Sequence, residues 1–169
     1  MGIDISALNL REVFSIATRI EEDGIEFYRA ASENTRNKRL WAVLDALLVQ
    51  EFEHKIILQD MAKEFGIYLN PDPRAIEISP QTVEALTEAE IFPRPEERDS
   101  AFASLHSPVD VVRFSIQVEK GAASFYKQAL KAAESEQVRG QLEKILAQEE
   151  RHVRVLKEVL KELKAKQKS

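Results

Sequence analysis

Apolar side chains recur at intervals of three or four residues along two long segments of the chain. One segment contains Leu40, Leu44, Leu47, Leu58, Met61 and Phe65, and the other contains Val138, Leu142, Ile145, Leu146, Val153, Leu156, Leu160 and Leu163. This spacing places the apolar side chains on one face of an α-helix. The segments 36–65 and 136–165 are therefore predicted to be long helices that each bury one side.

Two further helices are predicted, one before each of these segments. Asn9 and Glu12 have the spacing of a capping box, and Ser107 precedes a proline, Pro108, at the first helical position. Polar residues between the members of each pair predict turns, so each pair forms a hairpin. The predicted helices span 10–33, 36–65, 108–133 and 136–165, and the predicted turns span 34–37 and 134–136.

All six prolines lie in the middle of the chain, from Pro71 to Pro108. Because proline interrupts helices, the segment 66–107 is predicted to be a connection. Within it, Ser79-Pro80 would begin one short extra helix over 80–89. We therefore expect residues 1–169 to form a single all-α domain, a four-helix bundle made of a hairpin at 10–65, this connection, and a hairpin at 108–165.

The composition excludes several classes of protein. The 169 residues include no cysteine, which excludes disulfides, a thiol nucleophile and cysteine-ligated metals. Lysine and arginine number 24 against 29 acidic residues, a net charge of −5 that argues against nucleic-acid binding. No apolar run approaches the length that spans a membrane, and the start of the chain lacks the features of a signal peptide. We expect a cytoplasmic protein that binds neither nucleic acid nor membrane.

Charged residues interrupt both apolar stripes where their period requires core residues. Glu51 and His54 occupy such positions in one stripe, and Glu149 and His152 occupy them in the other. Both pairs read Glu-x-x-His, so their two side chains share a helix face. Burying charged side chains is costly unless they are paired or bind a metal. The alternative is that these four residues lie on solvated helix faces. It is disfavoured because residues on a solvated face would not interrupt the apolar stripe.

The two halves of the chain repeat with an offset of 98 residues. A glutamate lies 30 residues before each motif glutamate, Glu21 before Glu51 and Glu119 before Glu149. The midpoints of these intervals fall in the predicted turns, so each hairpin brings its two glutamates to the same height, about 22 Å from the turn. Packing the hairpins together then brings four glutamates and two histidines to one layer.

This set of side chains is typical of a carboxylate-bridged dinuclear metal centre. Hard oxygen donors with one imidazole per metal favour iron or manganese. Two iron ions, with manganese as the alternative, are therefore the expected cofactor. We expect one metal to be bound by Glu21 and His54, the other by Glu119 and His152, and both to be bridged by Glu51 and Glu149.

Tyrosines follow the two unpaired glutamates by seven residues, about two helical turns. Tyr28 and Tyr126 could hydrogen-bond a ligating carboxylate across the bundle, or could simply pack in the core. Gly24 and Ala122 lie one turn after the same glutamates. Their small side chains could leave room for dioxygen or peroxide, or serve helix packing.

These motifs, with the segment RIEEDGIEFY at 19–28, resemble the ferritin-like superfamily, and most closely its rubrerythrin-type di-iron domain. The resemblance implies a four-helix bundle with a long crossover between helices 2 and 3, which is the place of 66–107. It also implies a di-iron site at the six residues named above. Family members reduce hydrogen peroxide, oxidise Fe(II) or handle iron, usually as dimers or larger assemblies.

Two departures from the rubrerythrin pattern bear on activity. The chain has no cysteine for the rubredoxin-like domain that delivers electrons, and Ala122 stands where an extra carboxylate is often found. The remaining six-residue set is symmetric and closer to that of bacterioferritin-like centres. Electrons must therefore come from a separate donor or from further Fe(II).

The expected function is oxidation–reduction at a dinuclear iron centre, with hydrogen peroxide or dioxygen as the oxidant. The chain is expected to form a homo-oligomer, with a dimer as the leading form. Two alternatives stay open at this point. One is a non-catalytic iron-binding or storage protein, and the other is a structural bundle whose site is empty or holds manganese or zinc.

Overall fold

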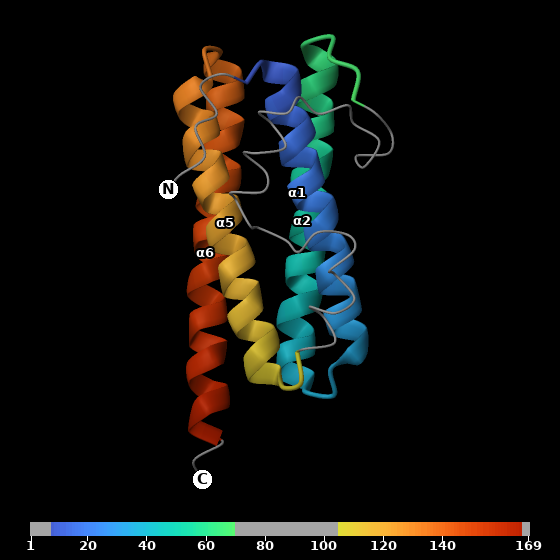
Figure 1. Ribbon diagram of the computed structural model, residues 1–169, viewed down its shortest axis with the longest axis vertical. Helices are drawn as coiled ribbons and strands as arrows, with labels where there is room; N and C mark the ends of the chain where they lie inside the picture. Colours follow the sequence, from blue (N-terminus) through green and yellow to red (C-terminus); the bar gives the residue numbers. More distant parts are fainter. Residues whose placement is uncertain (1–7, 70–104, 167–169) are drawn as a thin grey trace.

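A computed structural model describes residues 8–69 and 105–166, and these form four α-helices without a β-strand (Figure 1). The helices are α1 (Leu10–Asn34), α2 (Lys38–Glu64), α5 (Pro108–Ala132) and α6 (Glu136–Lys166). Each begins and ends within two residues of its predicted bounds. The all-α prediction is confirmed. The short helix expected at 80–89 lies outside the described residues.

Side chains at the predicted positions cap the first and third helices. The side chain of Asn9 accepts a hydrogen bond from the backbone N–H of Glu12, and the Glu12 carboxylate accepts one from the Asn9 backbone. Ser107 and Asp110 form the same reciprocal pair at the start of α5. These contacts satisfy backbone donors that have no partner inside the helix, which explains where both helices begin.

The end of α2 is set by a glycine. Gly66 has φ +65°, a left-handed conformation that other residues rarely adopt. Its N–H donates to the carbonyl of Lys63, and the N–H of Ile67 donates to the carbonyl of Ala62. This pair of bonds is the Schellman arrangement, which closes the last turn and directs the chain away from the helix axis.

The four helices form two antiparallel hairpins that lie side by side (Figure 1). Within the bundle, α1 lies beside α5, and α2 lies beside α6. The end of α2 and the start of α5 lie at opposite ends of the bundle, so these two helices run in the same direction. Such an arrangement requires a long connection between them, which matches the expected crossover.

The apolar core consists of two clusters. The first includes Phe14, Leu58, Phe125 and Ile145, and the second includes Phe27, Leu44, Val112 and Leu156. Along α1, α2 and α6, the buried residues of one cluster lie on one side of the predicted metal-binding positions, and those of the other cluster lie on the other side. The same division holds on α5, except that Val118 of the first cluster directly precedes Glu119. The candidate site is therefore a polar layer between two apolar regions. None of the described helices is long and apolar enough to cross a membrane.

Candidate metal centre

The six residues predicted to bind metal meet in the middle of the bundle. Glu21 comes from α1, Glu119 from α5, and each Glu-x-x-His pair from α2 or α6. All six have less than 5% of their surface exposed: Glu21, Glu51, His54, Glu119, Glu149 and His152. Four carboxyl groups in a dry layer would repel one another strongly without compensation.

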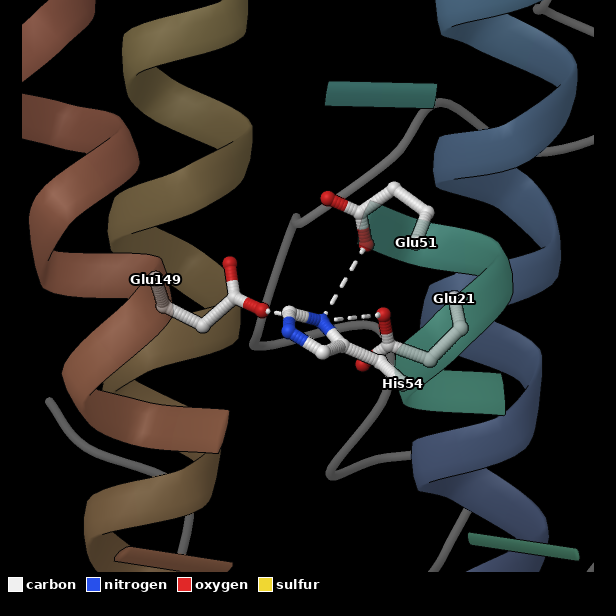
Figure 2. A group of neighbouring side chains, drawn as sticks. All are labelled: Glu21, Glu51, His54 and Glu149. Atoms are coloured by element: carbon white, nitrogen blue, oxygen red, sulfur yellow. Dashed lines mark hydrogen bonds and ion pairs between the residues drawn. The ribbon is translucent and has the colours of Figure 1, made fainter. Parts of the chain in front are cut away.

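The six side chains form two overlapping groups. One contains Glu21, Glu51, His54 and Glu149, shown in Figure 2, and the other contains Glu51, Glu119, Glu149 and His152. Within each group the candidate ligand atoms lie within 4.8 Å of one another. Glu51 and Glu149 belong to both groups. These are the two residues that the sequence predicts as bridges between the metals.

In the first group, three carboxylates surround one nitrogen of His54 (Figure 2). The Nδ1 atom lies 2.9 Å from Oε1 of Glu149, 3.3 Å from Oε2 of Glu21 and 3.8 Å from Oε2 of Glu51. Burial by itself lowers the pKa of His54, but contacts with Glu149 and Glu21 outweigh it and raise the pKa well above its ordinary value. A proton on Nδ1 thus occupies the place that a cation would take.

The second group repeats this geometry. The Nδ1 atom of His152 lies 3.0 Å from Oε2 of Glu119, 3.4 Å from Oε2 of Glu149 and 3.7 Å from Oε1 of Glu51. The two imidazole rings stack with their centroids 5.8 Å apart and an angle of 20° between their planes. Each half of the chain therefore supplies one equivalent half of the layer.

Several buried carboxylate oxygens lack a hydrogen-bond partner within the described part of the chain. They are Oε1 of Glu51 and both oxygens of Glu149; the contact of Oε1 of Glu149 with Nδ1 of His54 is an ion pair that does not meet hydrogen-bond geometry. A buried acceptor without a partner is costly, and native proteins seldom leave one unexplained. These oxygens belong to the residues shared by both groups, and two divalent cations between the groups would satisfy them. The residues present therefore fit a dinuclear metal centre.

The carboxyl groups differ in how readily they ionise. Burial raises the pKa of Glu51 well above its ordinary value, and repulsion from Glu149 and Glu21 raises it further. Burial and repulsion from Glu119 do the same for Glu149. For Glu21, burial alone would raise the pKa, but hydrogen bonds with Glu51 and His54 lower it overall. Burial alone would likewise raise the pKa of Glu119, but hydrogen bonds with Glu149 and His152 lower it in the same way. Without metal, the shared pair therefore favours the protonated form and the outer pair favours the ionised form.

The two tyrosines bind glutamates of the opposite hairpin. Tyr28 donates its hydroxyl hydrogen to Oε1 of Glu119, and Tyr126 donates to Oε1 of Glu21. Both rings are fully buried. Burial raises the pKa of each phenol, and repulsion from the neighbouring carboxylate raises it further, so both phenols stay protonated and remain donors. Of the two alternatives drawn from the sequence, the hydrogen-bonding one describes these contacts.

Gly24 permits a close approach of α1 to a shared glutamate. A Cβ atom added to Gly24 would lie 3.3 Å from Cγ and 3.4 Å from Cδ of Glu51. The missing side chain at Gly24 therefore leaves room for the side chain of Glu51. Its counterpart Ala122 is buried and belongs to the first apolar cluster.

Two glutamines also belong to the site, although sequence analysis did not identify them. Oε1 of Gln148 lies 2.7 Å from Nε2 of His54, and Oε1 of Gln50 lies 3.0 Å from Nε2 of His152. Each glutamine directly precedes a Glu-x-x-His motif, with the same offset of 98 residues as the other pairs. Extending the repeat by one residue would have found them.

A groove between α2 and α6 reaches one side of the layer. Its volume is about 580 Å³, and Gln50 and His152 contribute to its lining. The remainder of its lining combines small or apolar side chains with basic ones: Lys38, Arg39, Ala42, Val43, Ala46, Leu47, Arg151 and Val155. The groove therefore connects the surface with the second group of ligands.

A sequence model of the ferritin-like domain matches residues 107–168. The match covers α5 and α6, and so includes Glu119, Glu149 and His152. No significant match to this chain is found among curated proteins or among solved structures. The matched segment and the four-helix architecture are consistent with each other, since both indicate an all-α four-helix bundle. Through the internal repeat, residues before the matched segment supply the equivalents Glu21, Glu51 and His54.

Proposed function

We propose that the chain binds a carboxylate-bridged pair of iron ions and uses it for oxidation–reduction with hydrogen peroxide or dioxygen. The observation that carries this proposal is the pair of overlapping ligand groups that share Glu51 and Glu149. In this arrangement Glu21 and His54 would hold one ion, and Glu119 and His152 would hold the other. We also propose that the bundle is a rubrerythrin-type domain.

The donor set favours iron over softer metals. Each ion would receive one imidazole and otherwise carboxylate oxygens, which suit iron or manganese. Four carboxylates also balance the charge of two divalent ions, so loading neutralises the layer. The absence of cysteine from the whole chain removes the ligand that most favours zinc or copper(I).

When bound, the iron pair would supply the electrons and the coordination positions that reduction of peroxide or dioxygen requires. The protein surrounds that chemistry with fixed groups. Tyr28 and Tyr126 donate hydrogen bonds to Glu119 and Glu21 and so fix the orientation of these two carboxylates. The two apolar clusters exclude water from both sides of the layer. The groove between α2 and α6 is the route by which we propose that a small oxidant enters.

The chain has no cysteine with which to build an electron relay, so we propose that electrons come from a separate donor or from further Fe(II). We propose a cytoplasmic homodimer as the working form. Exposed apolar side chains on α2 support an association between copies, since Trp41, Val49, Phe52 and Ile56 are each 38–55% exposed.

The test is metal analysis of protein loaded anaerobically with Fe(II), followed by separate challenge with dioxygen and with peroxide. We expect two irons per chain and oxidation by at least one oxidant. Glu51→Ala and Glu149→Ala should abolish dinuclear binding, whereas Glu53→Ala, an exposed position on the same helix, should not. Less than about one metal per chain would overturn the proposal. Binding of two irons without oxidation would favour storage.

A further inference from the structure

A glutamine of the opposite hairpin contacts each candidate histidine ligand on the side of the ring that faces away from the carboxylates. His54 on α2 contacts Gln148 on α6, and His152 on α6 contacts Gln50 on α2. Both contacts involve Nε2, the ring nitrogen that points away from the carboxylates. The other nitrogen, Nδ1, faces the carboxylates in both cases. The two rings are therefore presented to the metal layer in the same orientation.

The orientation of the Gln50 amide is determined by its second contact. Its Nε2 group donates to the backbone carbonyl of Ala46 at 3.1 Å. A carbonyl oxygen can only accept, so the NH₂ group must face Ala46 and the Oε1 atom must face His152. An amide oxygen also only accepts, which requires a hydrogen on Nε2 of His152. With hydrogen on Nε2, the nitrogen left to bind a metal ion is Nδ1, which faces Glu119 and Glu149.

We propose that Gln50 and Gln148 are positioning residues that hold His152 and His54 in the form with hydrogen on Nε2, so that each ring binds metal through Nδ1. This inference rests on the proposed metal-binding function. Partners of this kind fix the tautomer and the direction of a ligating imidazole. Gln148 has the same place in the repeat and the same contact, at 2.7 Å.

A neutral amide differs from a carboxylate because it adds no charge beside the layer. The layer already contains four carboxyl groups, and a charged partner behind each ring would add to their repulsion. A carboxylate would also draw the Nε2 hydrogen toward itself and increase the basicity of the ring. The amide fixes the hydrogen without adding charge. The two glutamines thus orient the histidines at no electrostatic cost.

The contacts cross between the hairpins, and this makes the prediction specific for each metal. Removing the Gln50 side-chain amide should affect the ion held by His152 and Glu119, which belong to the other half of the chain. Removing the Gln148 amide should affect the ion held by His54 and Glu21. A glutamine that only packed at the helix interface would instead change both histidines together.

The experiment uses the full chain labelled with ¹⁵N in histidine and loaded with Zn²⁺, a diamagnetic probe. Long-range ¹H–¹⁵N correlation spectra distinguish a metal-bound ring nitrogen from one that carries hydrogen. In the unsubstituted protein we expect metal on Nδ1 and hydrogen on Nε2 for His54 and His152. A chelator competition then measures the affinity for each of the two zinc ions.

Gln50→Leu should change the ¹H–¹⁵N correlation pattern of His152 alone. It should also lower the affinity for one of the two zinc ions by about 10- to 100-fold, the usual effect of removing such a partner. Gln148→Leu should do the same for His54. Gln50→Glu, which keeps an acceptor at the same reach, should restore the His152 pattern. Gln59→Leu, at an exposed position on α2, is the matched control and should change neither measurement.

The outcomes that contradict the inference are distinct from those that contradict the proposed function. If the unsubstituted protein takes up neither zinc nor, under anaerobic loading, Fe(II), the metal-binding function fails, and the positioning role fails with it; uptake of Fe(II) without zinc overturns the positioning role as stated for both histidines. If zinc binds but Gln50→Leu and Gln148→Leu leave the patterns and affinities unchanged, the positioning role alone is wrong. It is also wrong if either substitution disturbs both histidines equally, or if Nε2 binds the metal.

Discussion

At the scale of the residue, the site could be predicted because charge appears where the helix period requires an apolar side chain. Glu51 and His54 interrupt an otherwise regular stripe, and the structure buries both. The glutamines could not be found in this way. Gln50 is partly exposed, and a polar residue beside a buried one looks like any other on a helix surface. Its importance depends on a contact across the bundle.

Glu51 allows ionisation and packing to be tested separately. Because burial keeps its pKa high, glutamine should imitate its protonated form. In the metal-free protein, Glu51→Gln should change the free energy of unfolding by less than about 1 kcal/mol, whereas Glu51→Ala should lower it by about 2 kcal/mol through the cavity it leaves. Both should prevent dinuclear binding. Denaturant titration and metal analysis measure the two effects, and equal destabilisation by both substitutions would contradict the prediction.

Tyr126 provides a second test at this scale. Tyr126→Phe keeps the buried ring but removes the hydroxyl that donates to Glu21, so an ionised carboxylate loses a hydrogen bond. We expect the free energy of unfolding of the metal-free protein to fall by about 1.5–3 kcal/mol, which denaturant titration measures. Tyr28→Phe should have a similar effect. Tyr68→Phe is the control, because Tyr68 is 75% exposed, and an equal effect there would refute the interpretation.

At the scale of the element, the helices followed from capping residues and apolar spacing, since both act within a few turns. The contacts between the two hairpins could not be predicted from these local patterns. The tyrosine contacts, the glutamine contacts and the groove all lie between hairpins, and no local pattern encodes which side chains face one another across that boundary. The 98-residue repeat predicts one shared layer, but it does not determine which partner each residue finds there.

The groove between α2 and α6 gives a prediction that concerns the two helices together. Ala46 lines it, and a larger side chain at this position should fill part of its volume. Ala46→Phe should leave two irons bound per chain while making oxidation of Fe(II) by dioxygen or peroxide several-fold slower. Stopped-flow absorbance measures the rate. Ala147→Phe, exposed on α6 but outside the groove lining, should oxidise iron at the ordinary rate. Equal rates in all three proteins would show that entry occurs elsewhere.

At the scale of the whole molecule, the core is divided by a layer of ionisable groups that the metal-free protein stabilises with bound protons and with hydrogen bonds. Burial places the pKa of Glu51 and of Glu149 well above the values of the unfolded chain. Above about pH 5 the unfolded chain has largely released these protons, while the folded protein retains them until the pH passes its raised pKa values. Folding therefore binds protons in this range, and the metal-free fold loses stability as the pH rises.

Because folding binds protons in this range, the metal-free and the metal-loaded protein should respond differently to pH. The melting temperature of the metal-free protein should fall from pH 5 to pH 8, with each of the two carboxyl groups lowering the free energy of unfolding by at most about 1.4 kcal/mol per pH unit. Metal replaces those protons, so the loaded protein should be more stable at pH 8, by about 2.7 kcal/mol when free metal is a hundred times the dissociation constant. Calorimetry of both forms across this range tests the prediction. A metal-free protein that is more stable at pH 8 than at pH 5 would contradict it.

The crossed contacts have one more consequence. Tyr28 reaches Glu119 as Tyr126 reaches Glu21, and Gln50 reaches His152 as Gln148 reaches His54. Residue i of one half contacts residue j of the other, and j of the first contacts i of the second, which is the rule for an isologous interface between identical subunits. The two hairpins therefore contact each other as two identical subunits would across a two-fold axis. Here both hairpins belong to one polypeptide, and each supplies the residues that the other one's half of the site needs.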